Sequence, residues 1–392
     1  MRIISEKVLN LPGYWIVNID NRSGQRYELV YRRKIVCPHC KSDKLSVKEK
    51  KLRVIRHENT ADRATFLDIH TAKYYCRCCH KYFWQQLPAI MPYNRKTEAF
   101  RKQVAFQAMR GVTKKDLSTD YEIGEATVYR YFIKELHLLS HEIQSYECPK
   151  VLGIDEHFFT KKQGFATTLC DITKHRIFDV LPGRSEKALE RYFQRLKHKE
   201  RCRVVVMDLS EPYRHLIRRF FPNAKIVSDR FHVIRVVNQH FMALWKQLDP
   251  VGKRNRGLLK LMRRHESRLT DEQKQRLRRY LNSIPALAAA YDFKQELAVL
   301  LLNKKRKRKE CKELIPKFIK SINQLKKSCF ESMVTLGNTL ESWQEEVVRM
   351  WRFTWSNGMT EGFHNKMKML VRRAYGFRNF ENYRLWVKIL CR

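Results

Sequence analysis

The pattern of hydrophobic and polar positions changes several times along the chain, and each change predicts a different kind of element. Apolar and polar side chains alternate in three short runs at 54–57, 64–70 and 73–75, which predicts short β-strands. From Thr97 onward, apolar residues recur every three or four positions until Gly111, which predicts a helix that ends at the glycine. The first part of the chain therefore combines a small β module with a helical one.

Two further short helices are predicted next. Thr113 is a suitable N-cap for a helix over 114–119, and after a turn that contains a glycine another helix opens at 126–132. This order is that of a helix-turn-helix, whose second helix enters the major groove of DNA. We expect Thr127 and Arg130 of that helix to contact DNA, although short helical pairs of this kind also occur as ordinary core packing.

The central part of the chain predicts a sheet whose strands end in acidic residues. Apolar runs end at Asp155, Asp208 and Asp229, and helical patterns precede the last two of these runs. Two further strands at 165–171 and 176–181 complete an antiparallel meander with the first run. A meander followed by alternating helices and parallel strands is the strand order of a ribonuclease H-like sheet, in which the first and fourth strands are neighbours.

That strand order places Asp155 and Asp208 side by side. Two carboxylates held together repel each other unless a divalent cation lies between them, and such oxygen ligands suit Mg²⁺ or Mn²⁺. Glu361, near the start of a predicted helix, is the best candidate for the third acid of a two-metal site, and Asp229 would support the site from the same sheet edge. Each acid taken singly is more often a turn, cap or solvated residue, so the prediction rests on their combination.

Composition adds a partner to this picture. The 392 residues carry 80 Lys and Arg against 40 Asp and Glu, a formal net charge of +40, and a charge of this size indicates a polyanionic partner. Nucleic acid fits best, because the alternative, an anionic membrane surface, would call for a basic amphipathic helix or a lipid-anchor motif, and neither is found. Without an apolar run of about 18 residues or a signal peptide, we expect a soluble protein of the cytoplasm.

Five of the eleven cysteines lie before residue 80, and four of them form two CxxC pairs. Cys37 with Cys40 and Cys76 with Cys79 have the spacing of two knuckles that bind one structural Zn²⁺ and leave no position open for water. Cys78 could replace a member of the second pair, and the neighbouring histidines could compete as ligands. With the short strands between the pairs, the pattern is that of a zinc ribbon.

In order along the chain, these motifs resemble those of insertion-sequence transposases of the DDE class, specifically the ISL-three family. The resemblance covers nearly the whole chain, and the segments that carry it are the two cysteine pairs, 152–156, 180–185, 206–208, 229–232, 357–362 and 373–380. It implies a ribonuclease H-like catalytic domain with the acid triad Asp155, Asp208 and Glu361, and a helical insertion before the glutamate. One departure is His80, where the family's zinc knuckle more usually has glycine.

We therefore expect a multidomain chain of α+β and α/β class. Its segments are a zinc-ribbon region at 1–93, a helix-turn-helix domain at 94–147, a ribonuclease H-like mixed sheet at 148–232, a large helical insertion at 233–350, and a last catalytic segment at 351–392 that carries the glutamate helix.

The expected function is DNA transposition. The chain would bind the terminal inverted repeats of an insertion sequence as a homodimer on double-stranded DNA, cut them with two Mg²⁺ or Mn²⁺ per active site, and join the ends to target DNA without a covalent enzyme intermediate. Asn365 would support the site. Phosphate contacts are expected from two basic groups, the first on the glutamate helix and the second in the cationic run at 304–309: Lys368, Arg372 and Arg373, and Lys304, Lys305, Arg306, Lys307 and Arg308.

Two alternatives remain open at this stage. A catalytically silent zinc-ribbon and helix-turn-helix regulator would bind DNA without Mg²⁺ and would not need the acids. A structure-specific nuclease of the same fold would cut DNA without terminal repeats.

Overall fold

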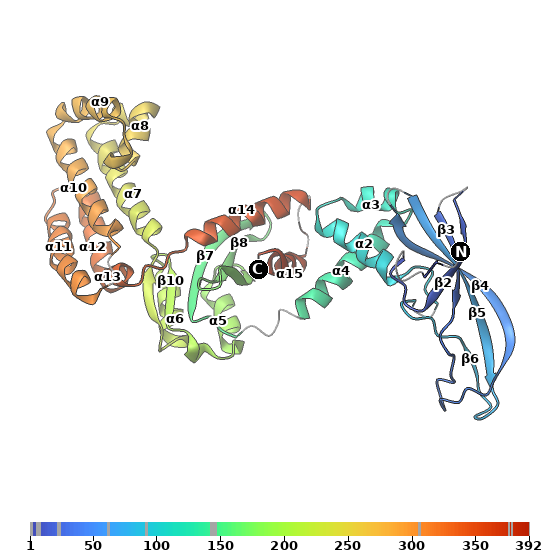
Figure 1. Cartoon of the computed structure of the whole chain (residues 1–392). Helices are drawn as coiled ribbons and strands as arrows, with labels where there is room; N and C mark the ends of the chain where they lie inside the picture. Colours follow the sequence, from blue (N-terminus) through green and yellow to red (C-terminus); the bar gives the residue numbers. More distant parts are fainter. Residues whose placement is uncertain are drawn as a thin grey trace. The chain divides into compact units, whose positions relative to one another are not determined.

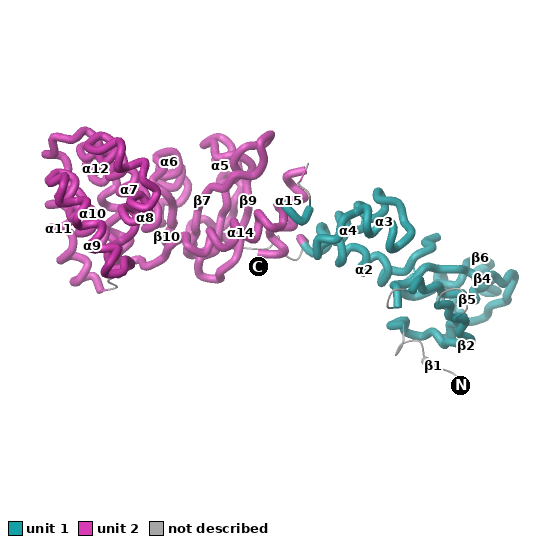
Figure 2. The backbone as a smooth tube through the Cα atoms, turned by 90° about the horizontal axis from the view of Figure 1, so that it is seen from above, with its two compact units in different colours: residues 1–139, 372–376 teal, residues 140–371, 377–392 magenta. Residues whose placement is uncertain are grey.

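The computed structural model describes residues 3–4, 9–21, 25–60, 63–90, 93–141, 147–304, 307–374, 377 and 379–391 (Figure 1). The backbone divides into two compact units (Figure 2). Unit 1 comprises residues 1–139 and 372–376, and unit 2 comprises residues 140–371 and 377–392.

Unit 1 contains a six-stranded sheet in the order β1-β2-β3-β5-β4, with β6 paired to β5. Its core is formed by side chains from four strands, among them Tyr14, Leu29, Ile55 and Leu67. The strands are β1 (Ile3–Ile4), β2 (Tyr14–Asp20), β3 (Gln25–Tyr31), β4 (Leu45–Thr60), β5 (Arg63–Cys76) and β6 (Tyr82–Trp84).

The expectation of short strands between the cysteine pairs was wrong. β4 and β5 form one long antiparallel hairpin, paired from Leu45 with Cys76 to Thr60 with Arg63. The first half of β4 is largely exposed and polar, so no hydrophobic alternation marks it, and its backbone hydrogen bonds to β5 hold it in the sheet.

Three helices follow in unit 1: α2 (Glu98–Met109), α3 (Lys114–Asp120) and α4 (Glu125–His141). Threonine caps fix the starts of the first two, since Thr97 Oγ1 accepts from the Phe100 amide and Thr113 Oγ1 from the Asp116 amide. Phe100, Leu117 and Val128 belong to their shared core. The helix-turn-helix stretch therefore folds around an apolar core of its own, with a second helix that begins at Glu125 and continues to His141.

Unit 2 is built on a five-stranded mixed sheet in the order β11-β10-β7-β8-β9. The first three strands along the chain form an antiparallel meander, and β10 runs parallel to both β7 and β11. This is the order expected for a ribonuclease H-like sheet, with the first and fourth strands adjacent. The strands are β7 (Val151–Thr160), β8 (Gly164–Asp171), β9 (Arg176–Pro182), β10 (Val204–Met207) and β11 (Lys225–Ser228).

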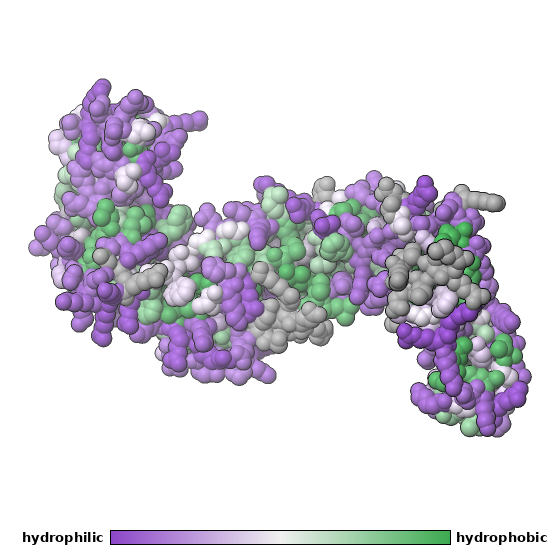
Figure 3. All heavy atoms as spheres, viewed as in Figure 1, coloured by the Kyte–Doolittle hydropathy of each residue, from purple (hydrophilic) through white to green (hydrophobic). Residues whose placement is uncertain are grey.

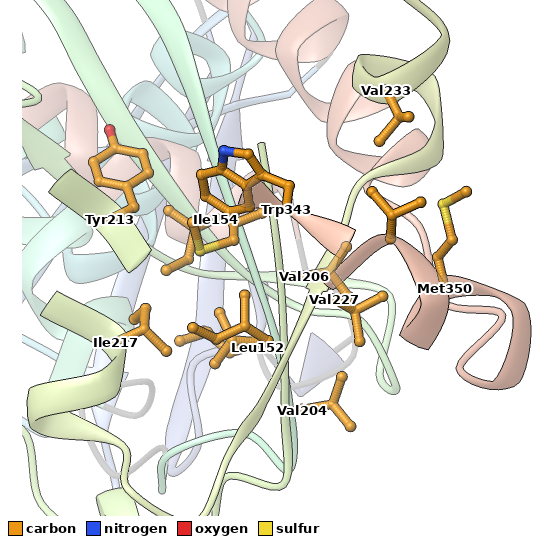
Figure 4. Packing of buried hydrophobic residues seen from close by; sticks show 14 of the residues in the cluster. Leu152, Ile154, Val204, Val206, Tyr213, Ile217, Val227, Val233, Trp343 and Met350 are labelled. Atoms are coloured by element: carbon orange, nitrogen blue, oxygen red, sulfur yellow. The ribbon is translucent and has the colours of Figure 1, made fainter. Parts of the chain in front are cut away.

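The core of unit 2 forms where the parallel strands meet their helices. Leu152 of β7 and Val204 of β10 lie in one buried cluster with Ile217 of α6 and Met350 of α13 (Figure 4). Because parallel strands are covered on both faces, their sequences are continuous apolar runs. The helices that complete this layer are α5 (Glu186–Arg195), α6 (Glu211–Phe220), α13 (Gln344–Arg352), α14 (Gly358–Arg373) and α15 (Phe380–Leu390).

A helical module is inserted between β11 and α13. Its outer part has a separate core that includes Trp245, Leu281 and Tyr291, while its surface there is mostly hydrophilic (Figure 3). The helices are α7 (Arg230–Leu248), α8 (Arg256–Arg263), α9 (Asp271–Asn282), α10 (Pro285–Leu302), α11 (Arg308–Lys326) and α12 (Glu331–Ser342), and 3₁₀ turns in unit 2 lie at Lys199–Arg201, Gly252–Arg254 and Glu266–Arg268. Among the described residues, no helix is both long and apolar enough to span a bilayer.

Candidate functional site

The four predicted zinc ligands converge in unit 1. The Sγ atoms of Cys37 and Cys79 lie 3.6 Å apart, those of Cys40 and Cys76 lie 3.5 Å apart, and all four lie within 4.8 Å of one another. Tetrahedral Zn²⁺ with bonds of about 2.3 Å to sulfur would separate its ligands by about 3.8 Å. The four thiols therefore fit a structural Zn²⁺, while Cys78 is exposed and lies outside the group.

The two cysteine pairs sit on two backbone turns of the same kind. The Lys41 amide donates to the Cys37 carbonyl at 2.9 Å, and the His80 amide donates to the Cys76 carbonyl at 3.0 Å. Lys41 and His80 both have positive φ, 63° and 56°. This left-handed conformation explains why a glycine suits the position that His80 occupies.

In unit 2 the sheet brings Asp155 and Asp208 together. β10 pairs with β7 so that Val206 lies opposite Gly153, and two residues further the same register sets Asp208 opposite Asp155. Their carboxylates and a ring nitrogen of His232 lie within 4.8 Å of one another. Three residues far apart in the sequence thus form one group of candidate metal ligands at the carboxyl edge of the parallel strands.

The electrostatics of this pair favour a cation. Burial, followed by the nearby charge of Asp208, raises the pKa of Asp155 to about 7. Burial also raises the pKa of Asp208, whereas the neighbouring His232 and the charge of Arg235 act to lower it. Two partly buried carboxylates that resist ionisation together are stabilised by a positive charge between them.

His232 is a member of the site that the sequence analysis did not assign. Its Nδ1 lies 2.5 Å from Oδ1 of Asp208 and 3.0 Å from Oδ2 of Asp229. Although burial disfavours the imidazolium, these two carboxylates raise the pKa of His232 to about 9. A single Nδ1 proton cannot serve both acids; its hydrogen bond goes to Asp229, and the buried Asp208 Oδ1 has no hydrogen-bond geometry to any described partner.

Asp229 connects the end of β11 to the residues that precede α14. Its Oδ1 accepts from the backbone amide of Asn357 at 3.1 Å, and the Asn357 side chain donates to the Ile154 carbonyl at 2.8 Å. Both Asp229 and Asn357 are buried. The residues directly before α14 are therefore attached to β7 next to Asp155 and to the residue that follows β11.

The helix that carries Glu361 lies over β7 and β8 (Figure 1). His364 on α14 has its Nδ1 3.8 Å from Oδ2 of Asp155 and its Nε2 3.1 Å from Oγ1 of Thr168. Glu361 is exposed and precedes His364 by three residues, about 4.5 Å along the helix axis. The structure does not bring Glu361 into the group of Asp155, Asp208 and His232.

The contacts of His364 continue inward through polar side chains. Thr168 Oγ1 is also 2.9 Å from Nδ1 of His157, whose Nε2 lies 2.9 Å from the Tyr383 hydroxyl of α15. Burial lowers the pKa of His157 to about 3 and that of His364 to about 4, so both rings are neutral near pH 7. These contacts hold in place the side of the site that faces the sheet.

The donor set fits a divalent cation. It offers two carboxylates, one with a buried oxygen that has no hydrogen bond among the described residues, and one imidazole. Carboxylate oxygens suit Mg²⁺ and Mn²⁺. Asp155 and Asp208 are the residues that would hold the ion.

The remaining predicted residues are placed as follows. On α4, Arg130 is exposed and hydrogen-bonds to the half-buried Thr127 at 3.0 Å. Asn365, Lys368, Arg372 and Arg373 are exposed on α14, and Lys304, Lys307 and Arg308 are exposed near the start of α11, whereas Lys305 and Arg306 lie outside the described residues.

The signals for the residues that were missed are local and weak. His232 follows Asp229 by three residues at a helix start, a spacing that permits a contact but does not reveal Asp208 as the second partner. His364 lies one turn after Glu361, and the sequence analysis assigned it no role.

Known proteins show the same two modules. A sequence model of the ISL3 family of DDE transposases, described as "Transposase", matches residues 152–387, more than half of the chain. A second model, the zinc-finger of transposase IS204/IS1001/IS1096/IS1165, matches residues 33–79. The chain is 22% identical over 369 residues to the transposase for insertion sequence element IS1001 of Bordetella parapertussis, which covers 90% of this chain and 88% of that protein. The family match spans the whole acid site, and the chain belongs to the ISL3 family of transposases.

Proposed function

We propose that the chain cuts DNA at the ends of an insertion sequence and joins those ends to target DNA in a divalent-metal-dependent reaction. Asp155 and Asp208 hold the metal, and Glu361 is the third acid. The observation that carries this proposal is the meeting of Asp155 and Asp208 at one sheet edge in a chain with a net charge of +40.

The two aspartates suit this role because a phosphodiester brings further negative charge to them. A strand of DNA cannot approach two ionised carboxylates unless cations compensate them, and bound metal would supply activation of water or a 3′-hydroxyl together with stabilisation of the leaving oxygen. His232 and Asp229 hold Asp208 and the start of α7 in place.

Glu361 is proposed as the third acid because of how its helix is attached. Asn357 hydrogen-bonds to Ile154, and His364 lies beside Asp155, so the residues on both sides of Glu361 are bound to the strand that carries the first acid. Its exposed side chain would be free to turn toward an ion held by Asp155 and Asp208. Asn365 and Lys368 lie on the exposed surface of the same helix and would support the site and hold DNA phosphates.

The DNA itself is proposed to be recognised by unit 1. The helix-turn-helix carries Arg130 on an exposed surface, and the zinc ribbon supplies a rigid β hairpin. Transposition joins two element ends in one event, and for that reason we propose a homodimer that acts on the bacterial nucleoid. The basic residues near 304–309 would add contacts to phosphates without sequence preference.

The test is cleavage and joining of a plasmid that carries the DNA flanking this gene, with Mg²⁺ or Mn²⁺. Wild type should cut at the element ends and join them, and Asp208→Asn should reduce cleavage by about 10³-fold or more, on the order expected for removal of a group that stabilises transition-state charge. Asp271→Asn, an exposed carboxylate at the start of α9, is the matched control and should cut like wild type.

Two results would redirect the assignment. Specific end binding without cutting by any of the three proteins would favour a DNA-binding regulator. Metal-dependent cutting of branched or single-stranded DNA, with no preference for the element ends, would favour a nuclease.

A further inference from the structure

A groove on the helical module begins next to the acid site. It has a volume of about 550 Å³, and its lining includes Phe231, Arg235, Lys246, Lys253 and Arg263. Phe231 directly precedes His232, and its ring is 62% exposed. The groove thus starts one residue in sequence from the acid cluster and runs along α7 to Lys253, in the 3₁₀ turn after α7, and Arg263, the last residue of α8.

The residues of α7 that line the groove form one continuous stripe. They recur at three- and four-residue spacing from Phe231 to Lys246, while the opposite face of the helix, with Val233, Val237 and Leu244, is buried. Fifteen residues of helix correspond to about 22 Å. Each strand of duplex DNA has one phosphate per about 3.4 Å of the duplex axis, so a duplex that lies along the groove would place about six phosphates of one strand along this length.

The groove carries cations and no acids. None of the ten side chains that line it is acidic, and within the described part of the chain no carboxylate lies within ion-pair distance of Arg235, Lys246, Lys253 or Arg263. Burial and the charges of Lys246 and Arg263 lower the pKa of Lys253, so these cations repel one another. Crowded, uncompensated cations are stabilised by a bound polyanion.

We propose that this groove holds the phosphate backbone of the DNA strand that reaches the acid site, and so gives the helical insertion a role in binding DNA. Arg235 lines the groove and is also close enough to Asp208 for its charge to act on that carboxylate. That a DNA strand leads from the groove to the acid site rests on the proposed function. The polar Asn238 and Gln239 between the cations suit phosphate and sugar oxygens and carry no base specificity.

The test is the salt dependence of binding to a fluorescein-labelled DNA duplex of arbitrary sequence, measured by anisotropy on the full chain. Removing one cation that neutralises a phosphate lowers the slope of log K against log[salt] by about 0.9. The double variant Lys246→Ala/Lys253→Ala should therefore lower the slope by about 1.8. Arg256→Ala/Lys260→Ala removes the same charge from exposed positions of α8 outside the groove and should leave the slope unchanged.

A second measurement does not depend on charge removal. A photoreactive benzoylphenylalanine in place of Gln239, in the middle of the groove, should crosslink to the duplex, whereas the same group in place of Lys260 should not. Equal slopes for the two double variants, or equal crosslinking at both positions, would overturn the proposal.

Neither Lys246 nor Lys253 belongs to the acid cluster, so a groove variant with an unchanged slope in a protein that still cuts DNA refutes only the groove. A reduced slope in a protein that never cuts DNA refutes only the proposed reaction.

Discussion

The Nδ1 atom of His232 lies 2.5 Å from Oδ1 of Asp208, so the first turn of α7 is attached to the end of β10. The same nitrogen hydrogen-bonds to Asp229, the residue that precedes the helix. One imidazolium therefore compensates two carboxylates at the sheet edge. This arrangement links the sheet of unit 2 to the helical insertion at the point where the candidate metal site and the cationic groove meet.

Replacing His232 should destabilise the metal-free protein. His232→Gln removes the positive charge between two partly buried carboxylates, and we expect a decrease of about 1–3 kcal/mol in the free energy of unfolding. Added Mn²⁺ should restore part of the decrease, since the cation compensates the same acids. Thermal unfolding with and without Mn²⁺ measures both effects. His198→Gln, at an exposed position, is the control; a melting temperature of His232→Gln equal to that of the control would contradict the account.

The attachment of α14 to β7 should depend on the side-chain amide of Asn357. Asn357→Ala removes the hydrogen bond from its side chain to the Ile154 carbonyl, and since both groups are buried we expect a cost of about 1–3 kcal/mol. Cleavage should fall further than stability alone explains, because the helix that carries Glu361 loses an attachment to β7. Asn323→Ala, at an exposed site of α11, is the matched control. Wild-type cleavage by Asn357→Ala at a temperature where it is fully folded would refute a positioning role.

Zinc should be required for unit 1 and bound at a ratio of one per chain. Cys37→Ser removes a ligand from the closed site, so it should lose zinc and expose the knuckles to proteolysis. Cys78→Ser, two residues from a ligand in the same knuckle, should retain full zinc content. Metal analysis of the two purified variants decides the point. Loss of zinc from Cys78→Ser would show that the ligand set includes Cys78.

Lys294 should make the helical module pH-sensitive. The side chain is buried against the rings of Phe241 and Tyr291, and burial lowers its pKa from 10.5 to about 8. Between these two values the unfolded chain binds more protons than the folded one, so this residue makes stability rise as the pH increases from 8 to 10.5. Below pH 8 both states carry the charge, and the penalty is constant.

The stability difference between wild type and Lys294→Met should therefore shift in favour of wild type as the pH rises, by on the order of 3 kcal/mol across the full interval. Denaturant unfolding at several pH values measures this difference, and Lys260→Met at an exposed position of α8 controls for general charge effects. A stability difference between wild type and Lys294→Met that does not change with pH would show that the pKa of Lys294 is the same in the folded and the unfolded chain.

The sheet of unit 2 was predictable because its sequence has a simple physical signature. Strands buried on both faces are continuous apolar runs, and the acids at Asp155, Asp208 and Asp229 follow those runs directly. Strand order then placed the first two acids together. The convergence of the four zinc ligands could likewise be predicted from their spacing in two pairs.

Other features depend on contacts that the sequence pattern does not express. The polar first half of β4 is a strand only because β5 supplies its hydrogen bonds, and β1 to β3 join the same sheet without having been predicted. The contact of His232 with Asp208, like that of His364 with Asp155, joins residues whose sequence separation gives no sign of a contact. Each forms only when a helix meets the sheet edge.

The central claim is that Asp155 and Asp208 share a divalent cation, and binding of Mn²⁺ to the zinc-loaded full chain tests it most directly. Titration followed by electron paramagnetic resonance should show saturable binding in wild type and in the control Asp271→Asn. Both Asp155→Asn and Asp208→Asn should lose this binding, because each removes one of the two carboxylates that hold the ion. Binding of Mn²⁺ by both variants with wild-type affinity would contradict the account.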